Sequence, residues 1–251
     1  MKRINSFAVV ICAAGSSRRM NGVKKEYCLL PGTNTTVLAR AVLAFAAFSG
    51  ISRIIITIPP KTPDAEAQCR RSLPSELVAG KLPQINFIPG GGSRRESVHN
   101  ALSALSRDPP DYVLIHDGSR PWVSGQLIRR VMEAVQQHKA VIPLLPLTDT
   151  PKEVDVPFSA DFSDKHGLPE GVLPVVTRHV HRNFMGAAQT PQAFAFQEIL
   201  AAHGKAAEKE RAGLHVYTDD AEVWGEFCGP VSVVPGEAEN RKITFYRDLD
   251  A

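Results

Sequence analysis

The chain has 251 residues, 43% of them hydrophobic and 22% charged, so it can bury a sizeable core in one domain or two small ones. The formal net charge of +3 is small, and the basic residues form no dense block interleaved with aromatics, which excludes an extended nucleic-acid surface. No run approaches the about 20 apolar residues that cross a bilayer, so no membrane contact is expected.

Short runs rich in valine and isoleucine predict buried strands, and apolar residues at helical spacing predict helices between them. Helices are expected around Val37–Phe45, Val98–Leu105 and Leu127–Val135, and again from about Ala195. This alternation predicts an α/β fold with a doubly wound, mostly parallel, Rossmann-like sheet. The predicted strands are 7–12, 53–58, 85–88, 112–115, 140–145, 231–234 and 242–245.

The alternation is interrupted between about residues 149 and 176. This stretch is rich in proline and acidic residues and has no sustained helical period. We expect an extended hairpin arm, residues 149–182, as a subdomain within a single domain that spans residues 1–251.

Small and basic residues follow the first predicted strand. Residues 13–17, AAGSS, let the backbone approach a ligand and direct N–H groups at it, and Arg18, Arg19, Lys24 and Lys25 can neutralise phosphate oxygens. The stretch is neither a Walker loop nor a GxGxxG motif, so a surface loop with solvated charges is the alternative interpretation. Ligands of parallel sheets bind beyond the carboxyl ends of the strands, which favours a site here.

Two further motifs follow later strands. After the third strand, three glycines lead into Ser93 and Glu96, which match a capping box and predict a helix start able to hold an anion or the edge of a base. At the end of the fourth strand, Asp117 suits a metal or sugar hydroxyl, and Arg120 suits a phosphate. A capped turn and a buried ion pair are the respective structural alternatives.

The four cysteines are Cys12, Cys28, Cys69 and Cys228, and they show neither CxxC pairs nor regular spacing. We therefore predict neither a zinc site nor a disulfide framework, and a cytoplasmic location.

Taken in order, AAGSSRRM, KKEY, GGGSRRESVHNAL, VLIHDGSRP, QTPQAF, TDDAE and NRKIT resemble the 2-C-methyl-D-erythritol 4-phosphate cytidylyltransferases. The resemblance covers residues 7 to 249. It implies a nucleotidyltransferase domain that transfers CMP from CTP to methylerythritol phosphate, giving 4-diphosphocytidyl-2-C-methyl-D-erythritol and pyrophosphate. It also implies Mg²⁺ or another divalent cation on the triphosphate, no metal site built by the protein alone, and a homodimer formed through the arm.

The resemblance carries over to individual residues. It implies that the catalytic residues are Arg19, Lys25 and Lys242. It implies that CTP is bound by Ala13, Ala14, Gly15, Ser16, Ser17, Gly91, Ser97, Asp117 and Gly118. The implied acceptor-binding residues are Arg120, Thr150, Arg182, Thr190 and Thr218, with Arg182 contributed across the dimer.

Two departures leave alternatives open. The usual proline before the loop lysine is Lys24 here, so either Lys24 or Lys25 reaches the triphosphate. In the arm, His181 replaces the usual acidic residue before the arginine. Cytidylyltransferases for ribitol 5-phosphate carry similar motifs, so that acceptor is the alternative. A nucleotide-binding module without catalysis is disfavoured because Arg19, Lys25 and Lys242 are all present.

Overall fold

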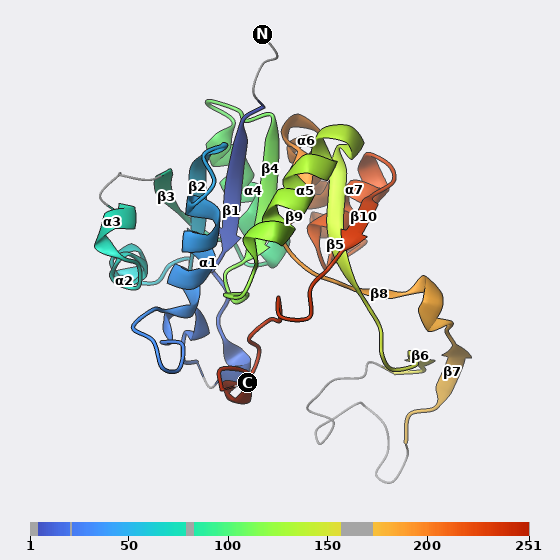
Figure 1. Cartoon of the computed structure of the whole chain (residues 1–251). Helices are drawn as coiled ribbons and strands as arrows, with labels where there is room; N and C mark the ends of the chain where they lie inside the picture. Colours follow the sequence, from blue (N-terminus) through green and yellow to red (C-terminus); the bar gives the residue numbers. More distant parts are fainter. Residues whose placement is uncertain (1–4, 21, 79–82, 157–172, 251) are drawn as a thin grey trace.

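The computed structural model describes residues 5–20, 22–78, 83–156 and 173–250 (Figure 1). Its centre is an eight-stranded mixed sheet with the path β10-β5-β9-β4-β1-β2-β3, and β8 pairs with β5. The strands are β1 (Phe7–Cys12), β2 (Ile51–Ile58), β3 (Gln84–Pro89), β4 (Tyr112–Asp117), β5 (Ala140–Pro146), β8 (Gly186–Ala188), β9 (Gln192–Ala195) and β10 (Ser232–Pro235).

Six of the predicted strands are confirmed, with ends within two residues of those expected. The predicted strand 242–245 is wrong. Ile243 donates its N–H to Ser119 O (2.9 Å), and its side chain is buried in a small apolar cluster, so the segment crosses the sheet end as a tail. A β-branched residue therefore indicated burial here, but not strand pairing.

The order in which parallel strands are added to the sheet reverses at β1. The chain passes from β1 to β2 and β3 on one side, then crosses to β4 on the other side of β1. Ligands of open α/β sheets bind at such a switch point. The sequence did not predict β9, which lies antiparallel between β4 and β5, because it has only four residues and runs straight into a helix.

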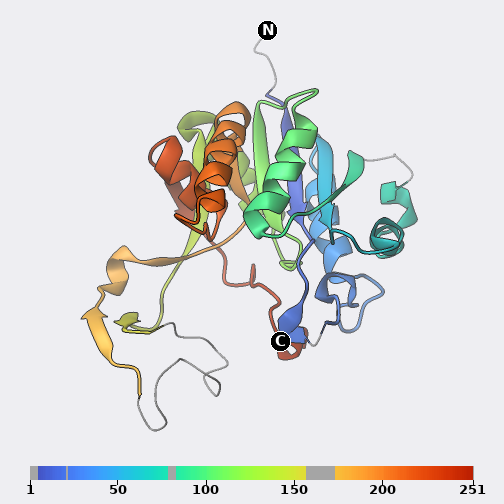
Figure 2. The same cartoon turned by 180° about the vertical axis from the view of Figure 1, so that it is seen from behind.

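Helices cover both faces of the sheet, as expected for a doubly wound fold (Figures 1 and 2). One apolar cluster joins β1 and β2 to α1 and α5, and the other joins β1 and β4 to α4, α6 and α7. The helices are α1 (Val37–Ala46), α2 (Ala65–Arg71), α3 (Ser75–Val78), α4 (Arg94–Leu105), α5 (Gly125–His138), α6 (Phe196–Arg211) and α7 (Asp220–Phe227).

Side-chain caps set where several helices begin. The Ser93 side chain accepts the N–H of Glu96 at α4, and the Asp219 side chain accepts the N–H of Glu222 at α7. The Glu96 carboxylate accepts the N–H of Gly92 (2.7 Å) in place of the N–H of Ser93 expected in a capping box. The helix start is still satisfied, and the glycine turn is tied down with it.

The arm is confirmed as an antiparallel hairpin of β6 (Lys152–Val154) and β7 (Val176–His179), which extends away from the main sheet (Figures 1 and 2). Residues 157–172 of the predicted arm lie outside the described residues. Apolar side chains on the described part are open to solvent, with Leu173 73% exposed, and Phe184 just after the arm is 89% exposed. Among the described residues, no helix is both long and apolar enough to cross a bilayer.

Candidate active site

A cavity of about 690 Å³ opens at the carboxyl ends of β1 and β4, at the switch point of the sheet. Its walls come from the loop after β1, the start of α4, and the C-terminal tail. The cavity brings together ten of the predicted residues: Ala14, Gly15, Ser16, Ser17, Arg19, Lys25, Gly91, Ser97, Asp117 and Lys242.

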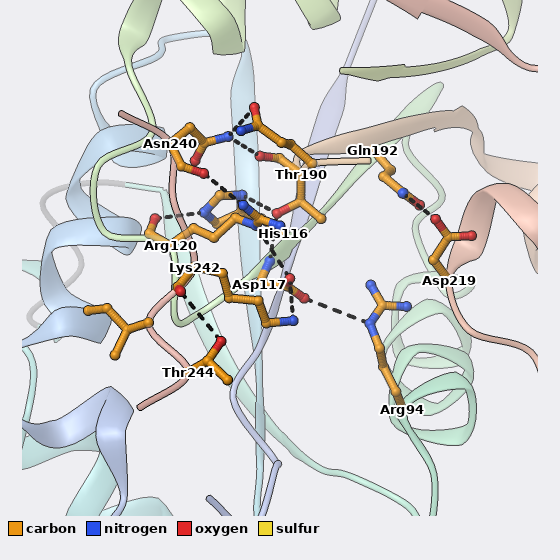
Figure 3. A network of polar contacts seen from close by, with 12 residues as sticks. Arg94, His116, Asp117, Arg120, Thr190, Gln192, Asp219, Asn240, Lys242 and Thr244 are labelled. Atoms are coloured by element: carbon orange, nitrogen blue, oxygen red, sulfur yellow. Dashed lines mark hydrogen bonds and ion pairs between the residues drawn. The ribbon is translucent and has the colours of Figure 1, made fainter. Parts of the chain in front are cut away.

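Asp117 lines this cavity, and basic side chains surround its carboxylate (Figure 3). Its side-chain oxygens lie 2.8 Å from Lys242 Nζ, 3.5 Å from Arg120 Nε and 3.7 Å from Arg94 Nε. Burial opposes ionisation, but the three cations outweigh it and hold the Asp117 pKa well below its usual range. Asp117 is therefore charged and fixes the positions of three basic side chains around itself.

Arg94 is a site residue that the sequence reasoning missed. It is the first residue of α4 and lines the cavity, and its Nη1 lies 2.8 Å from Oδ2 of the fully buried Asp220. Asp220 Oδ1 is in turn 3.2 Å from Nε2 of the buried His203. The available signal was helical spacing, since Arg94 precedes the predicted site residue Ser97 by three positions on the same helix.

A hydrogen-bonded chain behind the cavity orients the backbone of Asp117. His116 Nε2 lies 3.1 Å from Arg120 O, which can only accept, so the ring proton is on Nε2 and Nδ1 accepts from the Thr190 hydroxyl (3.0 Å). The Thr190 oxygen accepts the N–H of Asp117 (3.1 Å). Burial lowers the His116 pKa to about 4, partly opposed by its hydrogen bond to Arg120, so the ring is neutral at pH 7.

The glycine turn before α4 approaches the loop after β1 closely. A Cβ at Gly90 would lie 2.5 Å from Ala14 Cβ, so only glycine fits between the two loops. The Gly91 N–H donates to Ser97 Oγ (3.0 Å), which donates to Ser93 O (2.9 Å). The turn is rigidly held, and its backbone forms one wall of the cavity.

The loop after β1 presents free amides and positive charge. In the described part of the chain, the N–H groups of residues 14–17 have no hydrogen-bond acceptor. Lys25 lines the cavity and donates to Ile243 O (2.9 Å), and the Arg19 guanidinium lies 5.7 Å from the ring centre of Phe245. Burial lowers the Lys25 pKa, with Lys242 and Arg19 adding to this effect and Glu26 opposing it.

Four other predicted residues of the main body lie outside the cavity lining. Ala13 is fully buried, and Gly118 donates its N–H to Cys12 O (3.0 Å) behind the site. Thr190 is buried in the chain behind Asp117, as described above. The Thr218 hydroxyl donates to Glu222 (2.7 Å).

The remaining predicted residues contact other groups. Arg120 reaches Asp117 and donates to Asn240 O (2.7 Å). Thr150 and Arg182 lie on the arm, where Arg182 donates to Thr148 O (2.5 Å). None of the three lines the cavity within the described part of this one chain.

Two more cavity residues carried only weak sequence signals. Thr57, near the end of β2, accepts the N–H of Ala13 (3.0 Å) through its hydroxyl. Glu26 is only 3% exposed, although it lies between a lysine and a tyrosine in a charged stretch that is typical of a surface. Its burial depends on tertiary contacts.

Fold and site together are typical of α/β proteins that bind phosphate-bearing ligands at a switch point of the sheet. A parallel switch point carries a loop with free amides, and cationic side chains converge on it, which is the arrangement that binds phosphates. The chain belongs to the 2-C-methyl-D-erythritol 4-phosphate cytidylyltransferase (IspD) family, whose model matches residues 7–251. The family and fold expected from the sequence are thereby confirmed.

Individual relatives agree with this assignment. The chain is 34% identical over 252 residues to a bifunctional enzyme IspD/IspF of Chelativorans sp. (strain BNC1), covering 99% of this chain and 54% of that enzyme. It is similarly 34% identical to the bifunctional enzyme IspD/IspF of Rhodospirillum rubrum, covering 97% of this chain and 55% of that enzyme. The chain therefore spans about half the length of the curated relatives it matches.

Solved structures cover this chain almost end to end. The 2-C-methyl-D-erythritol 4-phosphate cytidylyltransferase of Thermus thermophilus superposes with a TM-score of 0.67 at 30% identity, covering 98% of this chain and 96% of that one. The 4-diphosphocytidyl-2C-methyl-D-erythritol synthase of Anaerococcus prevotii gives a TM-score of 0.76 at 28% identity, with 98% and 93% covered.

Proposed function

We propose that this protein transfers CMP from CTP to 2-C-methyl-D-erythritol 4-phosphate, releasing pyrophosphate and 4-diphosphocytidyl-2-C-methyl-D-erythritol. Family membership supports the reaction. The observation that carries it is the convergence of Arg19, Lys25 and Lys242 on one cavity whose wall is a loop with amides that have no acceptor among the described residues. Such a cavity suits a ligand that carries several phosphates.

The triphosphate is proposed to lie against the loop. N–H groups of residues 14–17 can donate to phosphate oxygens, and Lys25 and Arg19 supply positive charge beside them. Lys242 adds positive charge from the C-terminal tail and is held by Asp117 (2.8 Å). The phosphates would thus be surrounded by charge that is already in position, which is what phosphoryl and nucleotidyl transfer requires.

The base is proposed to lie against the glycine turn. The backbone at Gly91 is held by Ser97, and Gly90 packs closely against Ala14. The turn therefore forms a fixed wall of the cavity. A purine would be rejected by size, and uracil by the reversed hydrogen bonding at its 4-position. We therefore expect CTP to be preferred over ATP, GTP and UTP.

In the proposed reaction, a phosphate oxygen of the acceptor attacks the α-phosphorus in line. The bond from the α-phosphorus to its bridging oxygen breaks, and pyrophosphate leaves with the bonding electrons. Lys25 and Arg19 stabilise the charge that develops on the oxygens around phosphorus. The reaction as proposed needs no covalent intermediate with the protein.

A divalent cation is expected to accompany the triphosphate, and the residues fit that role. Mg²⁺ usually keeps several waters and binds one or two carboxylates together with substrate phosphates. Within the described residues, no cluster of three or more His, Cys, Asp or Glu side chains could hold a metal, and Asp117 and Glu26 are the carboxylate residues that line the cavity. The cation would neutralise phosphate oxygens and the leaving pyrophosphate.

The acceptor and the dimer are proposed together. Thr150 and Arg182 lie on the arm and do not line this chain's own cavity, so we propose that Arg182 of the partner subunit completes the acceptor site. Exposed apolar side chains on the arm, such as Leu173, Val175 and Val176, and Phe184 just after it, suit burial against a second copy. Free cysteines are compatible with the cytoplasmic location that we also propose.

The proposed reaction is tested by pyrophosphate release with Mg²⁺ and CTP. Methylerythritol 4-phosphate and ribitol 5-phosphate are offered in separate reactions, with Lys25→Ala as the catalytic control. We expect release with methylerythritol 4-phosphate and little with ribitol 5-phosphate. Release with ribitol 5-phosphate alone would overturn the acceptor, and CTP binding without release in either reaction would indicate a non-catalytic module.

A further inference from the structure

We infer that Lys24 is a positioning residue that holds the phosphate-binding loop in shape from behind, whereas its neighbour Lys25 faces the nucleotide. This inference deepens the proposed function and rests on it for the identity of the ligand. It answers which of two adjacent lysines reaches the triphosphate, a question that the sequence left open.

The ammonium group of Lys24 has partners for all of its donors. Its Nζ donates to Ala13 O (2.5 Å) and Gly15 O (2.6 Å) and lies 3.1 Å from Glu26 Oε2. A lysine ammonium has three hydrogens and these are three acceptors, so none is left for a phosphate. The side chain is only 17% exposed, and Lys24 does not line the cavity.

These contacts engage the carbonyl oxygens of the loop, which would repel a phosphate. The carbonyl oxygens of Ala13 and Gly15 are directed at Lys24, where their partial negative charge is compensated. The free N–H groups of residues 14–17 remain for an anion. A loop released from Lys24 could turn carbonyl oxygens toward the phosphates, which would repel them.

Glu26 extends the same restraint to the end of the loop. Its Oε2 lies 3.1 Å from Lys24 Nζ and accepts weakly from the Ser17 hydroxyl (3.4 Å). Ser17 has a φ of 49°, a left-handed conformation that a serine holds only when its surroundings enforce it. Lys24 and Glu26 therefore form a neutral pair that shapes the loop and adds little net charge to the cavity.

The test compares Lys24→Met and Lys24→Arg with Lys25→Met, and uses Lys205→Met as a matched control. Lys205 is an exposed residue of α6, far from the loop in sequence and outside the cavity. One readout is CTP affinity by calorimetry without acceptor. The second is the rate of tryptic cleavage after Arg19 without nucleotide, which reports the freedom of the loop.

We expect Lys24→Met to weaken CTP binding by roughly 10- to 100-fold, because hydrogen bonds to a charged group are lost. Its loop should be cleaved faster, and kcat at saturating CTP should fall by less than about 10-fold. Lys24→Arg should recover much of the affinity, and Lys25→Met should leave cleavage unchanged. Lys205→Met should match the unmodified protein in both readouts.

Unchanged CTP affinity and unchanged cleavage in Lys24→Met would overturn the inference. So would a large loss of kcat with normal affinity, which would place Lys24 among the reacting charges. If Lys24→Met leaves the buried Glu26 carboxylate unpaired and does not fold, the double variant Lys24→Met, Glu26→Gln supplies the same test. An unmodified protein that binds CTP but releases no pyrophosphate would refute the proposed reaction and leave both readouts valid.

Discussion

Lys242 Nζ lies 2.8 Å from Asp117 Oδ2, which joins the C-terminal tail to the end of β4 in the lining of the cavity. Neither residue belongs to the loop after β1, yet their contact sets the position of Lys242 beside the cavity. The same carboxylate also holds Arg94 and Arg120. One carboxylate therefore positions three basic side chains, of which Lys242 and Arg94 line the cavity.

Replacing Asp117 by Asn should lower the free energy of unfolding at pH 7. It should also weaken the loss of stability that acid causes in the unmodified protein. The Asp117 pKa is lower in the folded state than in the unfolded chain, so its contribution is fully present above about pH 4 and declines as the pH falls below that value. We expect a loss on the order of 2 kcal/mol at pH 7, because three cations lose their shared partner. Urea unfolding at pH 7, 4 and 3 measures both effects.

Asp108→Asn is the matched control for that experiment. The Asp108 side chain is 87% exposed, and its ion pair with Arg53 is a surface pair of the kind that contributes little. A destabilisation by Asp117→Asn no larger than that of the control would show that the charge cluster does not stabilise the fold.

Arg19→Ala and Lys25→Ala should separate turnover from binding. Both side chains are proposed to stabilise charge that develops at the α-phosphorus, so kcat should fall by roughly 100-fold or more while CTP affinity falls much less. Steady-state kinetics combined with calorimetry checks this. Equal losses in affinity and turnover would mean that the two residues only anchor the triphosphate.

At high pH, the activity should decline at a lower pH than it would if it depended on a lysine with the usual pKa. Lys25 is proposed to act in its charged form, and burial lowers its pKa from the usual value, with Lys242 and Arg19 acting in the same direction. The alkaline limb of kcat/KM for CTP should therefore lie below about pH 10.4, the usual lysine value. An arginine at position 25 keeps its charge throughout this range, so the pH profile of Lys25→Arg should lack this decline. An unchanged decline in Lys25→Arg would show that another group causes it.

Two inactive variants should complement each other if the arm completes the partner's site. Lys25→Ala damages the nucleotide side of its own cavity, and Arg182→Ala damages the acceptor side of the other cavity. A mixed dimer carries both lesions in one site and none in the other, so it should show about half the activity of the unmodified dimer. Co-expression with two different tags isolates the mixed dimer.

A mixed dimer of two differently tagged Lys25→Ala chains provides the background for this experiment. No gain over that background would contradict shared sites, provided that Arg182→Ala alone is inactive. A monomer in light scattering with full activity would refute the dimer itself.

Much of the fold was predictable because local patterns report burial directly. The valine and isoleucine runs of β1, β2 and β4 were recognisable as strands, and Ser93 was recognisable as the cap where α4 begins. The position of the site followed as well, since parallel strands place their carboxyl ends at one edge of the sheet. The motif order was sufficient to indicate the family, which the family model confirms.

Only the tertiary structure decided which side chains meet. The strand β9 is too short to show a period, and Ile243 is buried by a cluster that local sequence does not describe. Whether Lys24 or Lys25 faces the cavity depends on the path of a loop stabilised by the buried Glu26. By itself the sequence determined which segments are buried and which chemistry is present, because these depend on near neighbours. The pairing of Lys242 with Asp117 and of Arg94 with Asp220 depends on packing between distant segments, so it appears only in the folded chain.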